Sequence, residues 1–264
     1  MIKTVIFAIV MLFGTTQLSF SQDREHQIKR TAMAGGYNFL LTYDSTDFFK
    51  GSLIVSDESG LIVFSSEDFY SSCYTDTLVD LDSDGNDEFI LGLSTGMSPY
   101  VWSSLLVFEF ETAVSQPYEV INGELVSSKS GKSYIKATVR LSPSYLGALY
   151  SYLIEMRNGK LIVPNPREDF SSSGLLGDNS SWIEETISGF ENDVEECNAE
   201  SGYLTLFETY MIQAKFAGNE NFSKEFFRKR YKCDDMTAAY EIAQKYVNET
   251  FEYTVSQDFR FVTE

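Results

Sequence analysis

The segment Val79-Asp-Leu-Asp-Ser-Asp-Gly-Asn-Asp-Glu-Phe-Ile-Leu-Gly-Leu93 places an acidic loop directly before an apolar run. The run from Glu88 to Leu93 has the length and composition of a β-strand. Asp80, Asp82 and Asp84 alternate along the loop, so a tight turn can direct all three carboxylates inward. Gly85 permits the sharp bend that follows them. The segment therefore predicts a cation-binding loop that leads into a strand.

Calcium is the ion that this loop suits best, because calcium takes about six to eight oxygen ligands in a flexible geometry. Without an ion, the crowded carboxylates of the loop would repel one another. The loop is not an EF-hand, because its twelfth position is Leu91 and a strand, not a helix, follows it. The alternative is an acidic turn whose carboxylates face solvent. The expected ligands are the side chains of Asp80, Asp82, Asp84 and Glu88 and the backbone carbonyl of Asn86.

The pattern Asp-x-Asp-x-Asp-Gly-x-x-Glu between short apolar flanks resembles the calcium loop of FG-GAP or VCBS-type repeats. In that family the loop lies between strands of a β-propeller blade, and the resemblance implies the same five ligand positions. Ser83 stands where that family more often has glycine. A propeller needs several blades, and this chain has one such loop. We therefore expect a single blade-like sheet or a small sandwich that uses the loop as a structural staple.

The rest of the chain predicts an α+β protein, with an antiparallel β-rich region followed by a helical region. Strand-like runs flank the turn sequence at 57–60, and Asn122-Gly123 and Asn158-Gly159 are typical of hairpin turns. Apolar residues at helical spacing then begin at about residue 204. The predicted parts are a β-rich domain at 37–164, a linker at 165–180 and a helical domain at 181–264.

The first 21 residues have the plan of a secretory signal peptide: Lys3, an apolar stretch, and small residues at Ser19 and Ser21. Cleavage before Gln22 would leave a flexible segment at 22–36 and predicts a secreted or periplasmic protein. The apolar stretch is shorter than the roughly 20 residues of a membrane span, and we expect no span elsewhere.

Charge and cysteine content bound the partners. The chain has 39 Asp and Glu against 20 Lys and Arg, a net charge of −19, which disfavours nucleic acid as a partner. We expect calcium as one partner, and another protein or a surface glycan as candidates for a second. An oxidising compartment permits a disulfide, for which Cys197 and Cys233 are the favoured pair, with Cys73 left unpaired.

The sequence offers little support for catalysis. His26 is the one histidine, which argues against a His-ligated zinc site or a His-based triad. The leading interpretation is a non-enzymatic exported protein with one structural calcium loop, serving as a binding or interaction module. The alternative is a calcium-dependent hydrolase of cell-surface polymers that works with two carboxylates, one of them desolvated.

Overall fold

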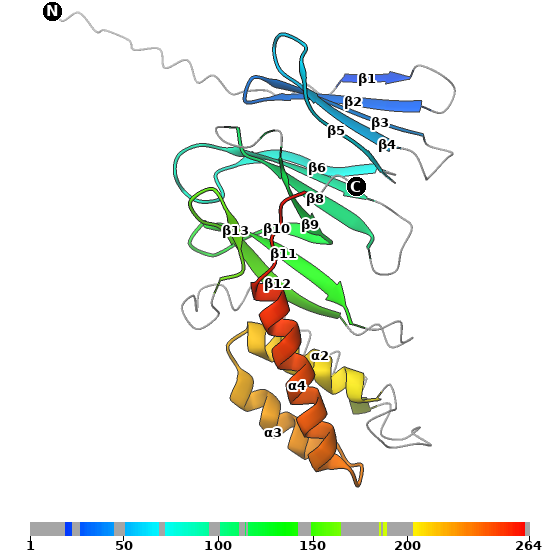
Figure 1. Cartoon of the computed structure of the whole chain (residues 1–264), viewed down its shortest axis with the longest axis vertical. Helices are drawn as coiled ribbons and strands as arrows, with labels where there is room; N and C mark the ends of the chain where they lie inside the picture. Colours follow the sequence, from blue (N-terminus) through cyan, green and yellow to red (C-terminus); the bar gives the residue numbers. More distant parts are fainter. Residues whose placement is uncertain are drawn as a thin grey trace, which may run out of the picture.

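The computed structural model describes residues 19–22, 27–44, 51–68, 72–94, 101–110, 114, 116–141, 149–164, 185, 187–188 and 203–261. Strands fill the N-terminal part and helices the C-terminal part, which confirms the predicted α+β class. Figure 1 shows the sheets stacked one after another along the long axis, with the helices at the far end. The predicted linker at 165–180 lies outside the described residues.

Each of the three sheets is an antiparallel meander of consecutive strands. The first sheet contains β1 Ser19–Gln22, β2 Gln27–Ala34, β3 Tyr37–Asp44, β4 Gly51–Ser56 and β5 Ile62–Asp68. The middle sheet contains β6 Ser72–Val79, β7 Glu88–Ser94, β8 Ser103–Phe108 and β9 Tyr118–Ile121. The third sheet contains β10 Gly123–Ser127, β11 Ser133–Arg140, β12 Leu149–Met156 and β13 Leu161–Ile162.

The two central strands of the middle sheet, β7 and β8, are buried on both faces, which explains why they are apolar along most of their length. Phe89, Leu91 and Leu93 of β7 belong to the core shared with the first sheet, whereas Ile90 belongs to the core shared with the third sheet and the helices. The centres of the Phe39 and Phe89 rings lie 4.4 Å apart across the first of these interfaces. A strand covered on one face would alternate apolar and polar residues; a strand covered on both does not need to.

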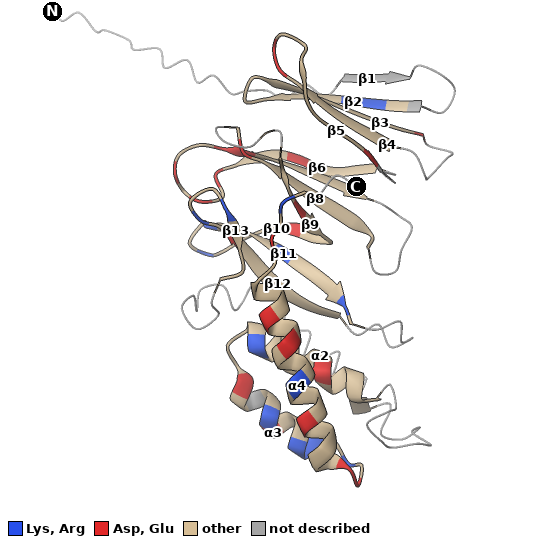
Figure 2. Cartoon of the chain, viewed as in Figure 1, with Lys and Arg blue, Asp and Glu red and all other residues tan. Residues whose placement is uncertain are grey.

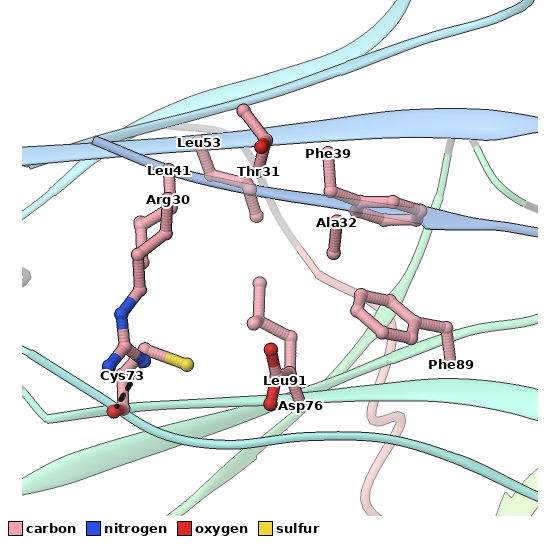
Figure 3. A pocket seen from close by; sticks show the side chains of 10 residues that line it. All are labelled: Arg30, Thr31, Ala32, Phe39, Leu41, Leu53, Cys73, Asp76, Phe89 and Leu91. Atoms are coloured by element: carbon pink, nitrogen blue, oxygen red, sulfur yellow. Dashed lines mark hydrogen bonds between the residues drawn. The ribbon is translucent and has the colours of Figure 1, made fainter. Parts of the chain in front are cut away.

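The interface between the first and middle sheets is closely packed. Its remaining gap, lined in part by Arg30, Cys73 and Asp76, has a volume of about 10 Å³, room for one water at most (Figure 3). Arg30 of β2 reaches across and donates a hydrogen bond from Nη1 to the Cys73 carbonyl at 3.0 Å. Burial raises the pKa of the Cys73 thiol, so this free cysteine is held in its unreactive form. The gap is a packing feature, not a ligand site.

Three helices are described in the C-terminal part: α2 Tyr203–Phe216, α3 Glu220–Arg230 and α4 Met236–Val255. Gln213 of α2 binds the open edge of β12, because its side-chain amide donates to the Ser151 carbonyl at 3.1 Å and accepts from the Ser151 N–H at 2.8 Å. Phe216 stacks on Tyr150 and Tyr152 of the same strand. None of these described helices combines the length and the apolar character needed to cross a bilayer.

The segment after α4 returns along the sheets and contacts two layers. The Glu119 N–H donates to the Phe259 carbonyl at 2.7 Å, and the Phe261 N–H donates to the Pro117 carbonyl at 2.9 Å. Phe261 then meets the first sheet, with its ring centre 5.4 Å from that of Phe64. This returning segment, Gln257–Phe261, links the helical part to the middle and first sheets.

Two local features differ from what the sequence indicated. Within 22–36, the segment expected to be flexible, Gln27–Ala34 forms β2 and pairs along its whole length with β3. The buried and partly buried residues of β2 include Arg30 and small alanines, so the sequence of this strand has only a weak apolar pattern. Asn122 was expected in a hairpin turn, but it joins β9 of the middle sheet to β10 of the third. Its backbone has the predicted positive φ, 52°.

The predicted cleavage between Ser21 and Gln22 falls inside β1, so export would remove most of that strand and leave β2 as the sheet edge. Cys233 is disulfide-bonded, and Cys73 is a free thiol, as predicted. Cys197, the predicted partner of Cys233, lies outside the described residues.

Candidate metal centre

The acidic loop connects β6 to β7 at one end of the middle sheet, where Figure 2 shows acidic residues in red. Val79 pairs with Glu88 at the base of the loop, so the strands fix both of its ends. Two residues between them adopt positive φ, Ser83 at 64° and Gly85 at 95°. Glycine adopts this conformation freely, whereas serine does so at a cost of about 1–2 kcal/mol. These two residues fold the loop tightly over its own carboxylates.

Three carboxylates converge within this loop. Asp80, Asp82 and Glu88 each place an oxygen within 4.8 Å of the other two. Asp80 and Asp82 are half-buried, and Glu88 is only 4% exposed. Carboxylate oxygens at this spacing could hold a metal ion, and such oxygens are the ligands of hard divalent cations.

Backbone N–H groups hold two of these carboxylates in place. The Asp80 carboxylate accepts hydrogen bonds from the N–H groups of Asp84 and Gly85, both at 3.1 Å. Glu88 Oε2 accepts from the Leu81 N–H at 2.8 Å. The Leu81 side chain is buried in the core beneath the loop, so this contact ties the glutamate to the packed interior. The convergence of the two carboxylates is therefore built into the loop backbone.

Asp84 and Asn86, the other predicted ligands, lie outside the converging trio. The Asp84 carboxylate accepts hydrogen bonds from the Asn86 N–H at 2.7 Å and from its side-chain amide at 3.4 Å. Both residues are exposed. The structure therefore brings together three of the five predicted ligand residues, and the participation of Asp84 and of the Asn86 carbonyl stays a prediction.

Asp82 makes a contact that the sequence did not indicate. Its Oδ2 accepts a hydrogen bond at 3.3 Å from the N–H of Gly159, in the turn between β12 and β13 of the third sheet. The Gly159 carbonyl in turn accepts a hydrogen bond from the Tyr118 hydroxyl at 2.6 Å. The other Asp82 oxygen, Oδ1, is buried and has no hydrogen-bond partner in the described part of the chain. Asp82 thus lies where the middle and third sheets meet, with one acceptor available to an ion.

The backbone conformation at residue 159 favours glycine. Its φ is 68°, and a Cβ atom there would lie 2.9 Å from Oε1 of Glu109. The sequence does identify Asn158-Gly159 as a turn, but loop and turn are far apart in the chain, and no spacing rule connects them. Only the stacking of the two sheets brings the turn to the loop.

The electrostatics of the trio favour an added cation. Burial, together with the charges of Asp82, Asp84 and Asp80, raises the pKa of Glu88 to about 7, against the opposing effect of the Leu81 N–H. A buried carboxylate among three other acids takes up a proton more readily than usual, because no built-in positive charge offsets its own. A divalent cation bound by the trio would supply that charge.

Comparison of the chain with protein-family models, with curated proteins and with solved structures found no match.

Proposed function

We propose that the chain is an exported, non-enzymatic protein in which a calcium ion bound by Asp80, Asp82 and Glu88 holds the middle sheet to the third, and that it serves as a binding or interaction module. The observation that carries the proposal is the convergence of these three carboxylates, one of which also bonds the neighbouring sheet. The acidic surface and the N-terminal sequence favour an exported protein.

Calcium suits the donor set better than its usual competitors. The trio offers oxygen and no nitrogen or sulfur, which disfavours zinc and copper. Magnesium needs near-ideal octahedral geometry, whereas calcium accepts an irregular set of six to eight oxygens. The three carboxylates supply some of these oxygen ligands. The expected sources of the other ligands are Asp84, the Asn86 carbonyl and solvent water. The buried, unpartnered Asp82 Oδ1 fits a role as a direct ligand.

Such an ion would act as a staple between layers. The loop extends from β6 and β7, and the turn that it touches extends from β12 and β13. An ion that fixes Asp82 also fixes the acceptor of the Gly159 hydrogen bond, so the two sheets are joined at their edge as well as through their apolar faces. Binding only to the folded state would then stabilise the protein by mass action.

Neither of the acids that are buried among the described residues supports the hydrolase alternative. It requires a desolvated carboxylate beside a second one in an open cleft. Two acidic side chains are buried among the described residues, Glu88 and Glu155. The first belongs to the loop, and the second forms ion pairs with Lys132 and Arg157.

Calcium titration calorimetry tests the proposal directly. The wild-type protein should take up one calcium ion per chain and should melt at a higher temperature in 1 mM calcium than in EDTA. If the dissociation constant is about 10 µM, the added stability is about 2.7 kcal/mol. Asp82→Asn should weaken calcium binding at least tenfold, because it removes a direct ligand charge.

Asp87→Asn is the matched control, since Asp87 is an exposed acid of the same loop outside the trio. It should bind calcium within about twofold of wild type. If the protein takes up no calcium, or melts at the same temperature in EDTA and in calcium, the proposed structural role of calcium is contradicted. If the protein is exported, the mature chain recovered outside the cytoplasm should begin at Gln22. Recovery of a chain that still begins at Met1 would contradict export with cleavage.

A further inference from the structure

A second site lies away from the acidic loop, at the junction of the middle sheet, the third sheet and the returning C-terminal segment. A cavity of about 440 Å³ opens there, with walls from β9, β11, β12 and residues 257–260. Small-molecule sites in proteins are commonly clefts of roughly 300–1,000 Å³. The cavity is therefore large enough for a compact ligand, and its place where three elements meet is typical of a binding site.

Arg140, the last residue of β11, lines this cavity. Its Nε atom is buried and has no hydrogen-bond acceptor, and its guanidinium forms no ion pair in the described part of the chain. A buried donor left without an acceptor costs about 1–3 kcal/mol. The planar guanidinium fork fits a carboxylate with two parallel hydrogen bonds. The buried Nε donor of Arg140 therefore lacks an acceptor among the described residues, and a ligand in the cavity could supply one.

The other arginine of the cavity is already engaged. Arg260 donates from Nη1 to the Gln116 carbonyl at 2.8 Å, and its guanidinium lies 3.9 Å from the centre of the Tyr118 ring. It holds the returning segment against the middle sheet. Of the two arginines, Arg140 is therefore the one available to a ligand.

The remaining wall limits the ligand to a single acidic group. Glu119 and Asp258 also line the cavity, so a second negative charge on the ligand would meet repulsion. Gln257 accepts a hydrogen bond from the Tyr152 hydroxyl at 3.3 Å through Oε1, which leaves its amide N–H groups as donors for the ligand. Ile121 and Val139 add apolar surface. The wall as a whole suits a small molecule with one carboxylate, neutral polar groups and an apolar edge.

We propose that this cavity binds a small organic monocarboxylate whose carboxylate is held by Arg140. An acidic sugar and the carboxyl end of an amino acid or short peptide share this chemistry. The inference is independent of the calcium site, because none of the cavity residues named here belongs to the acidic loop.

Two matched ligand pairs test the proposal in calcium-containing buffer: D-glucuronate with D-glucose, and N-acetyl-L-alanine with N-acetyl-L-alaninamide. At least one carboxylate should bind in the micromolar to low-millimolar range, at least tenfold tighter than its neutral analogue. Binding of glucuronate alone would assign a saccharide ligand, and binding of N-acetyl-alanine alone a peptide-like one. Failure of both carboxylates to bind would overturn the proposal.

Arg140→Gln should weaken binding of the carboxylate at least tenfold, and Arg140→Lys, which keeps the charge but not the fork, should weaken it less. Arg228→Gln removes the same charge from an exposed position on α3 and should leave binding unchanged. Because Arg140 makes no hydrogen bond to the residues that the structure describes, Arg140→Gln should melt at or above the wild-type temperature. Equal binding by wild type and Arg140→Gln, or a large fall in melting temperature of Arg140→Gln, would overturn the role of this residue.

Discussion

Two glutamates that are buried in the described part of the structure have opposite surroundings. Glu155 of β12 is 2% exposed and is flanked by two cations, Lys132 and Arg157, with which it forms ion pairs. Glu88 of β7 is 4% exposed and is flanked by three aspartates. The first carboxylate has its compensating charges built into the third sheet. The second has none in its loop, and its pKa rises to about 7.

The contrast shows how a buried carboxylate with a purely structural role can be distinguished from one in a candidate metal centre. Burying a charge without a partner is costly, so folded proteins either pair it, protonate it or bind an ion to it. Glu155 uses the first solution. Glu88 can take up a proton near neutral pH, and it can bind an ion when calcium is present. The feature that marks a candidate metal centre is therefore the absence of neighbouring cations, more than the number of acids.

Removal of both cations from Glu155 should turn it into a second Glu88, with the largest effect expected here. Lys132→Met combined with Arg157→Met leaves a buried carboxylate without a cation, which typically lowers the free energy of unfolding by about 3–5 kcal/mol. Urea denaturation at pH 7 measures the loss. Lys136→Met with Lys245→Met removes two charges whose ion pairs are weak, at 3.9 Å each, and should cost less than about 1 kcal/mol. Equal costs for the two double variants would break the comparison.

Local patterns predicted the class of the fold and the loop. The hairpin of β4 and β5 follows from its turn, where Asp57 Oδ1 accepts from the N–H groups of Ser59 and Leu61. The helix face with Leu204, Phe207 and Tyr210 is buried as its spacing predicts. These features depend on residues within a few positions of one another, so the sequence alone can specify them.

Features that depend on stacking could not be predicted in the same way. The chain passes from the middle sheet to the third at Asn122, whose side chain accepts from the N–H groups of Trp102 and Ser103 and donates to the Thr138 carbonyl. The Asn-Gly pair at 122–123 is equally typical of a hairpin turn when only the sequence is known. The contact of Asp82 with Gly159 and the cavity at Arg140 also join segments distant in the chain, and no periodicity records such pairs.

The pH dependence of stability should distinguish the two glutamates in the absence of metal. The folded-state pKa of Glu88 is about 7, above the ordinary value of 4.5. Its contribution to stability is thus fully present below about pH 4.5 and is lost as the pH rises through 7. Between pH 5 and pH 8 in EDTA, this term should lower the free energy of unfolding by about 2 kcal/mol.

Glu88→Gln should remove this pH dependence, and saturating calcium should reverse it, since the ion binds the deprotonated carboxylate. Denaturation curves at several pH values, with EDTA and with calcium, give the measurement. Glu155→Gln serves as the comparison, because it alters the other buried carboxylate, which already has cations beside it. A wild-type protein whose stability in EDTA is flat over this range would show that Glu88 is compensated in some other way.

The contact between loop and turn offers the smallest and most specific test. Gly159→Ala places a methyl group 2.9 Å from Glu109 Oε1 at a φ of 68°. Gly131→Ala imposes similar backbone strain, at a φ of 89°, but its added methyl meets open space. Each should lose about 1 kcal/mol from strain. Only Gly159→Ala should also weaken calcium binding, by several fold, because it displaces the N–H that orients Asp82. If both variants bind calcium like wild type, the ion is held by the loop alone, and the two sheets are joined only by their apolar faces.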